Sequence, residues 1–272
     1  METRNLDWQR IERAIKQEAR RYNTENKVGW ALEATKRVID FSGPASSSRA
    51  MCVRIGKILL GDTQTIIVPS CPMHYAYEND RFAFAGVNPG VSFLTEKHIE
   101  FLKKITGVLP EAKPIILIPD QEANDPDLLG AMKISAEELA EVMYKSIEAT
   151  KNAVEPLGWQ AKAMTEAVPD LSEREKQAAE WIRESEEFTL RINNDTIARQ
   201  AMYYALASAG RRAGMPVEEM VHRTIRTAAQ YVAIGRYTAE KGYLVVSHTT
   251  TNLMWYFQTD AAVLHNPVSI YQ

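Results

Sequence analysis

The sequence predicts an α/β fold, in which a parallel sheet carries helices on both faces. Three observations support this prediction. The 272 residues are 45% hydrophobic and 25% charged, a composition typical of globular proteins. Strand-like and helix-like segments alternate through the middle of the chain, which is the pattern of βαβ units. The segment KPIILIPD (113–120) is apolar without alternation, as expected of a strand buried on both faces of a parallel sheet.

The N-terminal part of the chain is expected to begin with helices and to continue with strands. Apolar residues recur at helical spacing in 5–22, and 27–40 is expected to form a second helix. The composition of SGPASSSRA (42–50) predicts a loop. Short β-branched segments bounded by Gly, Asp and Pro then predict strands at 55–61 and 63–70.

From residue 81 onward, strands and helices are expected in turn. RFAFAGVNPG (81–90) predicts a strand that ends in a turn, and the amphipathic segment from Thr95 predicts the helix that follows. The segment 134–156 is expected to form a long helix that begins with a capping box at Ser135. The segments 172–195 and 196–214 are predicted to form one or two long helices, and 217–242 is predicted to form another. The segment 243–257 then returns to β character.

We expect a single α/β domain over residues 1–272. Within it, 1–50 is predicted to be a helical N-terminal extension, and 51–272 a core with a helical lobe. A chain of this length is close to the size at which single cores stop growing. The sequence contains no Gly/Ser-rich linker or repeat that would divide it.

Charge and cysteine content narrow the classes of function. The chain has 32 Lys+Arg against 35 Asp+Glu, so a site for a polyanion must be a local patch. Cys52 and Cys71 are too few for a disulfide scaffold or a zinc cluster. The N-terminus lacks an apolar signal segment, and no stretch approaches the roughly 20 apolar residues of a membrane span. A cytoplasmic protein with no membrane partner is expected.

The turn GVNPGVSF (86–93) is the first candidate site. Ligands of open α/β sheets bind beyond the carboxyl ends of the strands, and this turn joins a predicted strand to a helix. Free N–H groups at the helix start would hold a carboxylate, phosphate or acyl oxygen. The turn matches neither GxGxxG nor GxSxG, so it is neither a dinucleotide fingerprint nor a hydrolase elbow. A plain turn in which Ser92 caps the helix explains the same residues.

Acidic residues and histidines are further candidate site residues. PDQEANDPD (119–127) follows the buried strand, and its Asp120 and Glu122 suit a cationic group such as a planar guanidinium. A solvated loop is the competing interpretation. The five histidines show no HExxH or paired spacing, so no metal site is expected. A Ser–His–acid relay stays open but has no motif in its favour.

Three blocks of the chain, over roughly residues 80–262, resemble the tRNA-dependent cyclodipeptide synthases. RFAFAGVNPGVSFLTEKHIEFLKKI is similar to that family's strand ending in Gly-x-Ser-x-x-Asn-Ser-Tyr/Phe, whose first Ser accepts the acyl group. IILIPD and the long helix after it are similar to the family's next strand and its tRNA-facing helix. The helix carrying QYV, followed by YLVVSHTTTNLMWYF, resembles the Tyr-x-x-x-Glu helix and the final Pro-Ser-Ser-x-x-Cys-Tyr-His strand. The chain looks like the divergent fungal branch whose products contain arginine.

The resemblance carries over unevenly. The nucleophilic serine position falls on Asn88, whereas Ser92 falls on the family's second serine. Tyr231 matches the helix tyrosine, but its glutamate partner falls on Gly235. Tyr256 matches the tyrosine of the last strand. Two catalytic groups of the family are therefore missing at their usual positions.

Roles can nevertheless be assigned as expectations. Catalytic roles are expected for Ser92, Asn88, Tyr231 and Tyr256, with Ser70 and Cys71 as alternative nucleophiles. Substrate binding or proton transfer is expected from Gly86, Asp120, Glu122 and Glu187. Binding of tRNA is expected from the densest basic stretch, which includes Arg211, Arg212, Arg223 and Arg226. The long helix that faces tRNA in the family offers only Lys145 and Lys151 here.

The resemblance implies a Rossmann-like fold, similar to the catalytic domain of class I aminoacyl-tRNA synthetases but without their ATP-binding HIGH motif. It implies two substrates, arginyl-tRNA and a second aminoacyl-tRNA, which are joined and cyclised to a diketopiperazine. An ester is already activated, so no ATP, metal or other cofactor is expected. Two alternatives stay open: a non-catalytic α/β relative that binds tRNA or regulates, and a serine hydrolase that uses Ser92 with a histidine.

Overall fold

The computed structural model describes residues 6–62, 64–70, 73–78, 81–87, 89–120, 129, 134–186, 188, 192, 217–248 and 260–267. At its centre lies a five-stranded, all-parallel sheet with the strand order β5-β4-β1-β6-β7. Its strands are β1 (Thr65–Pro69), β4 (Lys113–Ile118), β5 (Gln160–Ala163), β6 (Leu244–His248) and β7 (Ala262–Asn266). The predicted α/β, Rossmann-like fold is therefore confirmed.

The strand order reverses at β1. From β1 the chain proceeds to β4 and then to β5, and it later returns to the other side of β1 to form β6 and β7. Ile66 accordingly pairs with Pro114 of β4 on one side and with Leu244 of β6 on the other. Open α/β sheets bind ligands beyond the carboxyl ends of the strands at such a reversal. The fold thus directs attention to the end of β1.

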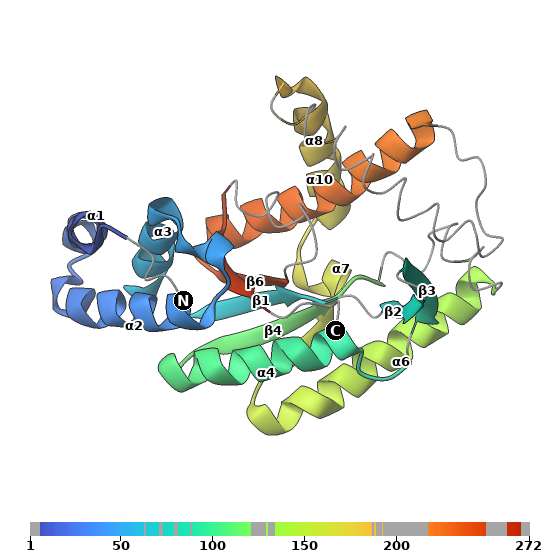
Figure 1. Cartoon of the computed structure of the whole chain (residues 1–272), viewed down its shortest axis with the longest axis horizontal. Coiled ribbons are helices and arrows are strands. Elements are labelled where there is room, and N and C mark those ends of the chain that lie inside the picture. Colours follow the sequence, from blue (N-terminus) through green and yellow to red (C-terminus); the bar gives the residue numbers. More distant parts are fainter. Residues whose placement is uncertain are drawn as a thin grey trace.

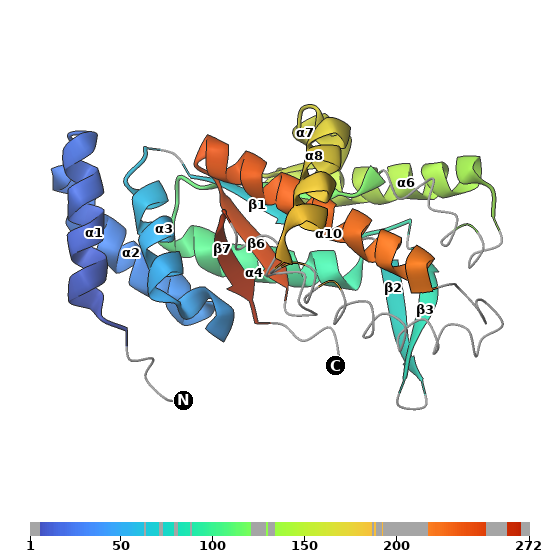
Figure 2. The ribbon, with the colours of Figure 1, turned by 90° about the horizontal axis from the view of Figure 1, so that it is seen from above.

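Helices cover both faces of the sheet (Figure 1). One face carries α4 (Phe93–Val108) and α6 (Ala136–Val154). The other carries α10 (Val217–Lys241), against which α8 (Leu171–Glu184) packs. Figure 2, from above, shows α10 crossing over the sheet. Both faces are therefore buried, which explains why the central strands are almost wholly apolar.

Three N-terminal helices lie at the β7 end of the sheet (Figures 1 and 2). They are α1 (Trp8–Arg21), α2 (Val28–Phe41) and α3 (Arg49–Leu59), and both α2 and α3 contact β7. Ile11 and Ile15 of α1 are fully buried against the others. A side chain at Gly56 of α3 would meet the terminal carbon of Ile15 at 2.2 Å, so the helices approach closely there.

The prediction of a strand at 55–61 is wrong, because this segment belongs to α3. Ser48 caps the helix by accepting a hydrogen bond from the backbone N–H of Met51 at 3.1 Å. The buried residues Cys52, Ile55 and Leu59 recur at helical spacing. A short apolar run is compatible with the periodicity of a helix and with that of a strand. Here the contacts with α1 and α2 stabilise the helix. The predicted loop at 42–50 is correspondingly shorter, since a 3₁₀ turn occupies Pro44–Ser47.

The expected strand at 81–90 exists but lies outside the parallel sheet. It is β3 (Arg81–Val87), which pairs with β2 (Met73–Glu78) as an antiparallel hairpin. Strands β2, β5 and β7 were not predicted, and β5, with the sequence QAKA, is too short and too polar to stand out. The predicted helix at 196–214 lies outside the described residues, as does most of the β segment after His248.

The other predicted elements that the structure describes are confirmed. Ser135 and Glu138 form the expected capping box of α6, with hydrogen bonds of 3.2 and 2.7 Å. Helices α1, α2, α4 and α10 and strands β1, β4 and β6 also lie where the patterns place them, whereas α8 covers only the first part of the predicted segment 172–195 and ends at Glu184. Among the helices described here, none combines the length and the apolar character that a bilayer span requires.

Candidate functional site

Three hydroxyl groups meet at the carboxyl end of β1. Ser70 follows β1, Ser92 is the N-cap of α4, and Thr95 lies in the first turn of α4. The Oγ1 atom of Thr95 is 2.7 Å from Oγ of Ser70 and 2.8 Å from Oγ of Ser92. All three residues are at most 2% exposed. We call Ser70, Ser92 and Thr95 the hydroxyl cluster.

Local structure fixes both ends of this cluster. The backbone N–H of Ser70 donates to the carbonyl of Leu117 at 2.8 Å, which ties the end of β1 to β4. Ser92 has an extended backbone, and its Oγ accepts a hydrogen bond from the N–H of Thr95 at 3.2 Å. The hydroxyl of Ser146 in α6 donates to the carbonyl of Gly90 at 3.2 Å. The turn before α4 is therefore anchored between the sheet and α6.

Ser92 has a structural role in this arrangement. Its oxygen satisfies one of the N–H groups that a helix start leaves without an intrahelical partner. This is the plain-turn interpretation of the sequence, and it applies whatever chemistry the serine performs. A nucleophilic role for Ser92 would have to coexist with the cap.

One turn further along α4, His98 meets the end of β7. His98 is fully buried, and its Nδ1 lies 3.3 Å from Nδ2 of Asn266. Nδ2 of Asn266 also donates to the carbonyl of Lys97 at 3.2 Å. Ser247, near the end of β6 and paired with His265 in the register, is buried as well. Polar groups therefore line the carboxyl edge from β1 to β7, beside α4.

Asp120 occupies the corresponding position after β4. Its Oδ1 accepts a hydrogen bond from the backbone N–H of Thr165 at 3.1 Å, and its Oδ2 accepts one from the Thr165 hydroxyl. Thr165 lies just after β5, in α7 (Met164–Ala167). Each carboxylate oxygen can accept a second hydrogen bond. The partly exposed Asp120 is thus held at the edge with acceptor capacity left for a ligand.

Tyr231 reaches the same level from the opposite face of the sheet. It precedes Lys241, the last residue of α10, by ten residues, which span about 15 Å of helix. The chain reverses at Gly242 and Tyr243, and the five residues of β6 then span about 16 Å. Tyr231 therefore lies near the carboxyl end of β6, half-buried against the core. It approaches the edge from the α10 side, whereas the hydroxyl cluster lies on the α4 side.

Sequence reasoning missed a carboxyl group between α8 and α10. Partial burial raises the pKa of Glu175 above the ordinary value, while a hydrogen bond to Gln230 and the charge of Arg226 offset part of the rise. Gln230 directly precedes Tyr231 on α10. Shifted carboxyl groups of this kind are frequent at functional sites. Only the packing of α8 on α10 brings these residues together, so no pattern in the sequence could have signalled it.

The α8–α10 contact is itself fixed by charged side chains. Arg174 holds Glu240 through two hydrogen bonds of 3.1 and 3.0 Å. The guanidinium of Arg236 lies over the ring of Trp181, 4.4 Å from its centroid. These contacts set the position of α8, and hence that of Glu175, relative to the sheet.

The remaining expected site residues divide into two groups. Gly86 pairs with His74 in the β2–β3 hairpin, and Arg223 and Arg226 belong to α10. The others lie outside the described residues: Asn88, Glu122, Glu187, Arg211, Arg212, Tyr256 and the alternative Cys71. Within the described ranges, no group of three or more His, Cys, Asp and Glu side chains is arranged to hold a metal ion.

The chain has some similarity to a solved protein structure. No protein-family model matches the chain. No curated protein matches it either. Among solved structures, the crystal structure of the PvcA (PA2254) protein from Pseudomonas aeruginosa is similar, with 13% sequence identity and a TM-score of 0.47. The alignment covers 87% of this chain and 82% of that chain.

Proposed function

We propose that this chain is an enzyme that takes amino acids from two aminoacyl-tRNAs and joins them into a cyclic dipeptide, a 2,5-diketopiperazine. The observation that carries the proposal is the hydroxyl cluster at the carboxyl end of β1, where the strand order reverses. Serine hydroxyls accept acyl groups from esters when a neighbouring group removes the proton. The cluster supplies two serines linked through one threonine.

The contacts favour Ser70 over Ser92 as the group that accepts the acyl chain. The oxygen of Ser92 is engaged in capping α4, and moving it would expose a helix N–H group. The oxygen of Ser70 has Thr95 as its side-chain partner and lies at the very end of the strand. A small rotation of Ser70 therefore leaves both the helix and the sheet intact.

The proposed reaction has three steps. In the first, the serine oxygen attacks the ester carbonyl of arginyl-tRNA, and the ribose oxygen leaves with the proton. In the second, the amine of the other aminoacyl-tRNA attacks the serine ester, which forms a dipeptidyl-tRNA and returns the proton to the serine. In the third, the free amine of that dipeptide attacks its own ester carbonyl, and the ribose oxygen of the second tRNA leaves with the proton that the amine loses. The protein supplies orientation and proton transfer.

Two further residues have proposed roles in this scheme. Asp120, already oriented by Thr165, is suited to receive the guanidinium of an arginyl group, since carboxylates bind guanidinium in a planar fork. Tyr231 is suited to orient the incoming amine from the α10 side of the edge. Arginine as one of the two residues rests on Asp120 and on its sequence neighbour Glu122.

The test is a reaction with purified components. The protein is incubated with arginyl-tRNA and a pool of the other aminoacyl-tRNAs, and small molecules are analysed by mass spectrometry. We expect an arginine-containing diketopiperazine that disappears when arginyl-tRNA is omitted or when ribonuclease is added first. Asp120→Asn should lower the yield at least several-fold. A complete pool that gives no diketopiperazine would refute the proposal.

One observation favours a second candidate, a non-catalytic module that binds tRNA. The hydroxyl cluster is buried and its members bond to one another, as structural hydroxyls do. This candidate predicts salt-sensitive tRNA binding without product in the same reaction. The two candidates are therefore separated by one experiment.

A further inference from the structure

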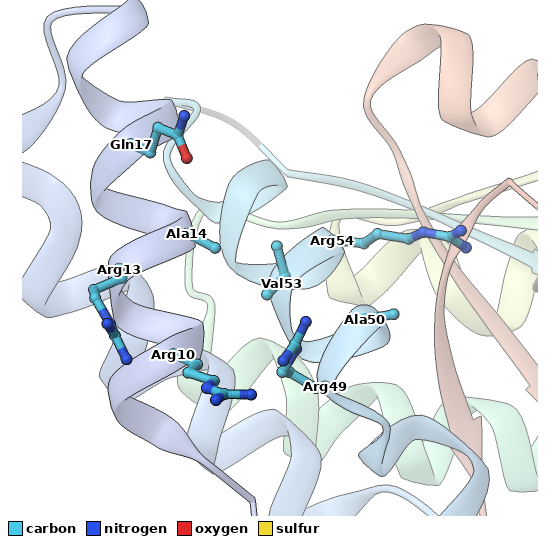
Figure 3. A pocket seen from close by; sticks show the side chains of 8 residues that line it. All are labelled: Arg10, Arg13, Ala14, Gln17, Arg49, Ala50, Val53 and Arg54. Atoms are coloured by element: carbon cyan, nitrogen blue, oxygen red, sulfur yellow. The ribbon is translucent and has the colours of Figure 1, made fainter.

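A groove between α1 and α3 is lined by four arginines (Figure 3). Its volume is about 630 Å³, and the arginines are Arg10 and Arg13 from α1 and Arg49 and Arg54 from α3. Small residues, including Ala14 and Ala50, line it as well. In Figure 3, Arg10 and Arg49 reach into the space between the helices, whereas Arg54 extends toward the strands. This agrees with the 3.2 Å hydrogen bond from Arg54 to the carbonyl of Ala261.

Acidic neighbours neutralise little of this charge. Asp7 pairs with Arg10 at 3.1 Å, but that arginine side chain is still 61% exposed. The other carboxylates of α1 are engaged with cations that do not line the groove: Glu12 with Lys16, and Glu18 with Lys57 and Arg21. Within the described part of the chain, Arg13 and Arg49 have no ion-pair partner.

The backbone adds to the positive potential. Arg49 is the first residue of α3, which begins after the N-cap Ser48 and has no acidic residue in its first turn. The start of a helix carries a partial positive charge and attracts phosphate groups. An arginine guanidinium can donate two parallel hydrogen bonds to a phosphate group. Arg49 at the start of α3 and Arg10 of α1 both line the groove there (Figure 3).

We propose that this groove binds the phosphate backbone of a tRNA, an inference that rests on the proposed function. The residues of α1 that line it run from Arg10 to Gln17, about 10 Å along the helix, which suits an extended polyanion better than a single small anion. The long helix α6 offers no alternative, because Lys145 and Lys151 are each ion-paired, with Glu141 and Glu148. The groove supplies the basic surface that α6 lacks.

The test measures binding of deacylated tRNA, so that it does not depend on the reaction. The double variant Arg13→Gln/Arg49→Gln removes two exposed groove charges. It spares Arg10, which is ion-paired with Asp7, and Arg54, which donates to the carbonyl of Ala261. Arg37→Gln/Arg183→Gln removes two exposed arginines outside the groove and serves as the control. Dissociation constants are measured by filter binding over a series of salt concentrations.

We expect the groove variant to bind tRNA about tenfold more weakly than the wild type. The plot of the logarithm of the association constant against the logarithm of the salt concentration should become shallower, its slope losing about 1.5 in magnitude, since each lost phosphate contact removes roughly 0.7–0.9. The control should match the wild type. Unchanged binding by the groove variant would overturn the inference.

Parallel measurements separate this inference from the proposed function and from other anions. If the groove variant loses tRNA binding while the wild type forms no diketopiperazine, the inference stands and the proposed reaction fails. If the wild type forms product and the groove variant binds tRNA normally, the reaction stands and the inference fails. Displacement of tRNA by low millimolar inorganic phosphate, or a groove-dependent preference for phosphatidylserine vesicles over tRNA, would also overturn it.

Discussion

Thr95 is the residue on which the hydroxyl cluster depends, because its one hydroxyl joins Ser70 to Ser92. Replacing it with valine keeps the shape and removes one hydrogen-bond partner from each of two buried serine hydroxyls. We expect Thr95→Val to lower the free energy of unfolding by about 1–3 kcal/mol, measured by urea denaturation. Diketopiperazine yield should fall as well.

Thr150→Val is the matched control for that variant. Thr150 is also fully buried in a helix, but its hydroxyl donates only to the carbonyl of Ser146 in its own helix, at 2.8 Å. Thr150→Val should lower the free energy of unfolding by less than Thr95→Val does, and it should leave the diketopiperazine yield unchanged. Equal losses of stability and of yield in both variants would show that the cluster has no special role.

Glu175 provides a prediction about pH. Because its pKa is raised by burial, the folded protein binds this proton more tightly than the unfolded chain does. Its contribution to stability is therefore present below the ordinary pKa of glutamate and is lost as the pH rises through the raised pKa. Glu175→Gln should be more stable than the wild type at pH 7, and the difference should vanish below about pH 4.

This prediction is checked by urea denaturation of both proteins between pH 3.5 and 8, a range chosen to bracket about pH 4.3, the ordinary glutamate pKa. Glu180→Gln removes one charge from an exposed position on the same helix and serves as the control. A constant difference between Glu175→Gln and the wild type over the whole range would contradict the assignment.

At the level of the elements, the start of α4 and the start of α6 form a natural comparison. Both begin with a serine cap, Ser92 and Ser135, but only Ser92 belongs to the hydroxyl cluster. Ser92→Ala and Ser135→Ala should each lower the free energy of unfolding by about 1 kcal/mol. Only Ser92→Ala should also lower diketopiperazine yield, because it disturbs Thr95 and Ser70. Equal yields of diketopiperazine from the two variants would show that Ser92 acts only as the N-cap of α4.

The junction between the N-terminal helices and β7 gives a second comparison. A Cβ atom at Gly43 would lie 2.0 Å from Nδ1 of His265, although the backbone there suits any residue. Gly43→Ala should therefore destabilise the protein by about 1–3 kcal/mol through overpacking. Gly29→Ala meets nothing within 4 Å in α2 and should leave the protein equally or more stable. The midpoints of thermal unfolding of both variants test whether the backbone at Gly43 lies as close to His265 of β7 as the structure places it.

Elements with a long or strongly patterned sequence could be predicted, and short ones could not. The apolar run of β4 and the capping box of α6 can be recognised from a few neighbouring residues in the sequence. The segment 55–61 does not, because its period is ambiguous and contacts with α1 and α2 determine its structure. The position of Ser92 at a helix start was predictable from the turn before it. The bridge from Ser70 through Thr95 was not, since it joins residues 25 apart through the packing of α4 on the sheet.

On the scale of the whole molecule, two separate regions are proposed to bind tRNA, the hydroxyl cluster its aminoacyl end and the groove its phosphate backbone. The hydroxyl cluster lies at the end of the central strand β1, and the groove lies between α1 and α3, in the helical layer that contacts β7 through α2 and α3. With a net charge of -3, the chain has no general attraction for nucleic acid. A tRNA would therefore have to be recognised through local basic surfaces such as the groove.

The most direct test of the central claim is the mass of the intact protein after reaction with arginyl-tRNA alone and rapid quenching in acid. The wild type and Ser135→Ala should each gain the mass of one arginyl group, and peptide mapping should place that group on Ser70. Ser70→Ala should show no such gain. A wild type that gains no mass, or a Ser70→Ala variant that is modified as fully as the wild type, would contradict the claim that this hydroxyl receives the amino acid.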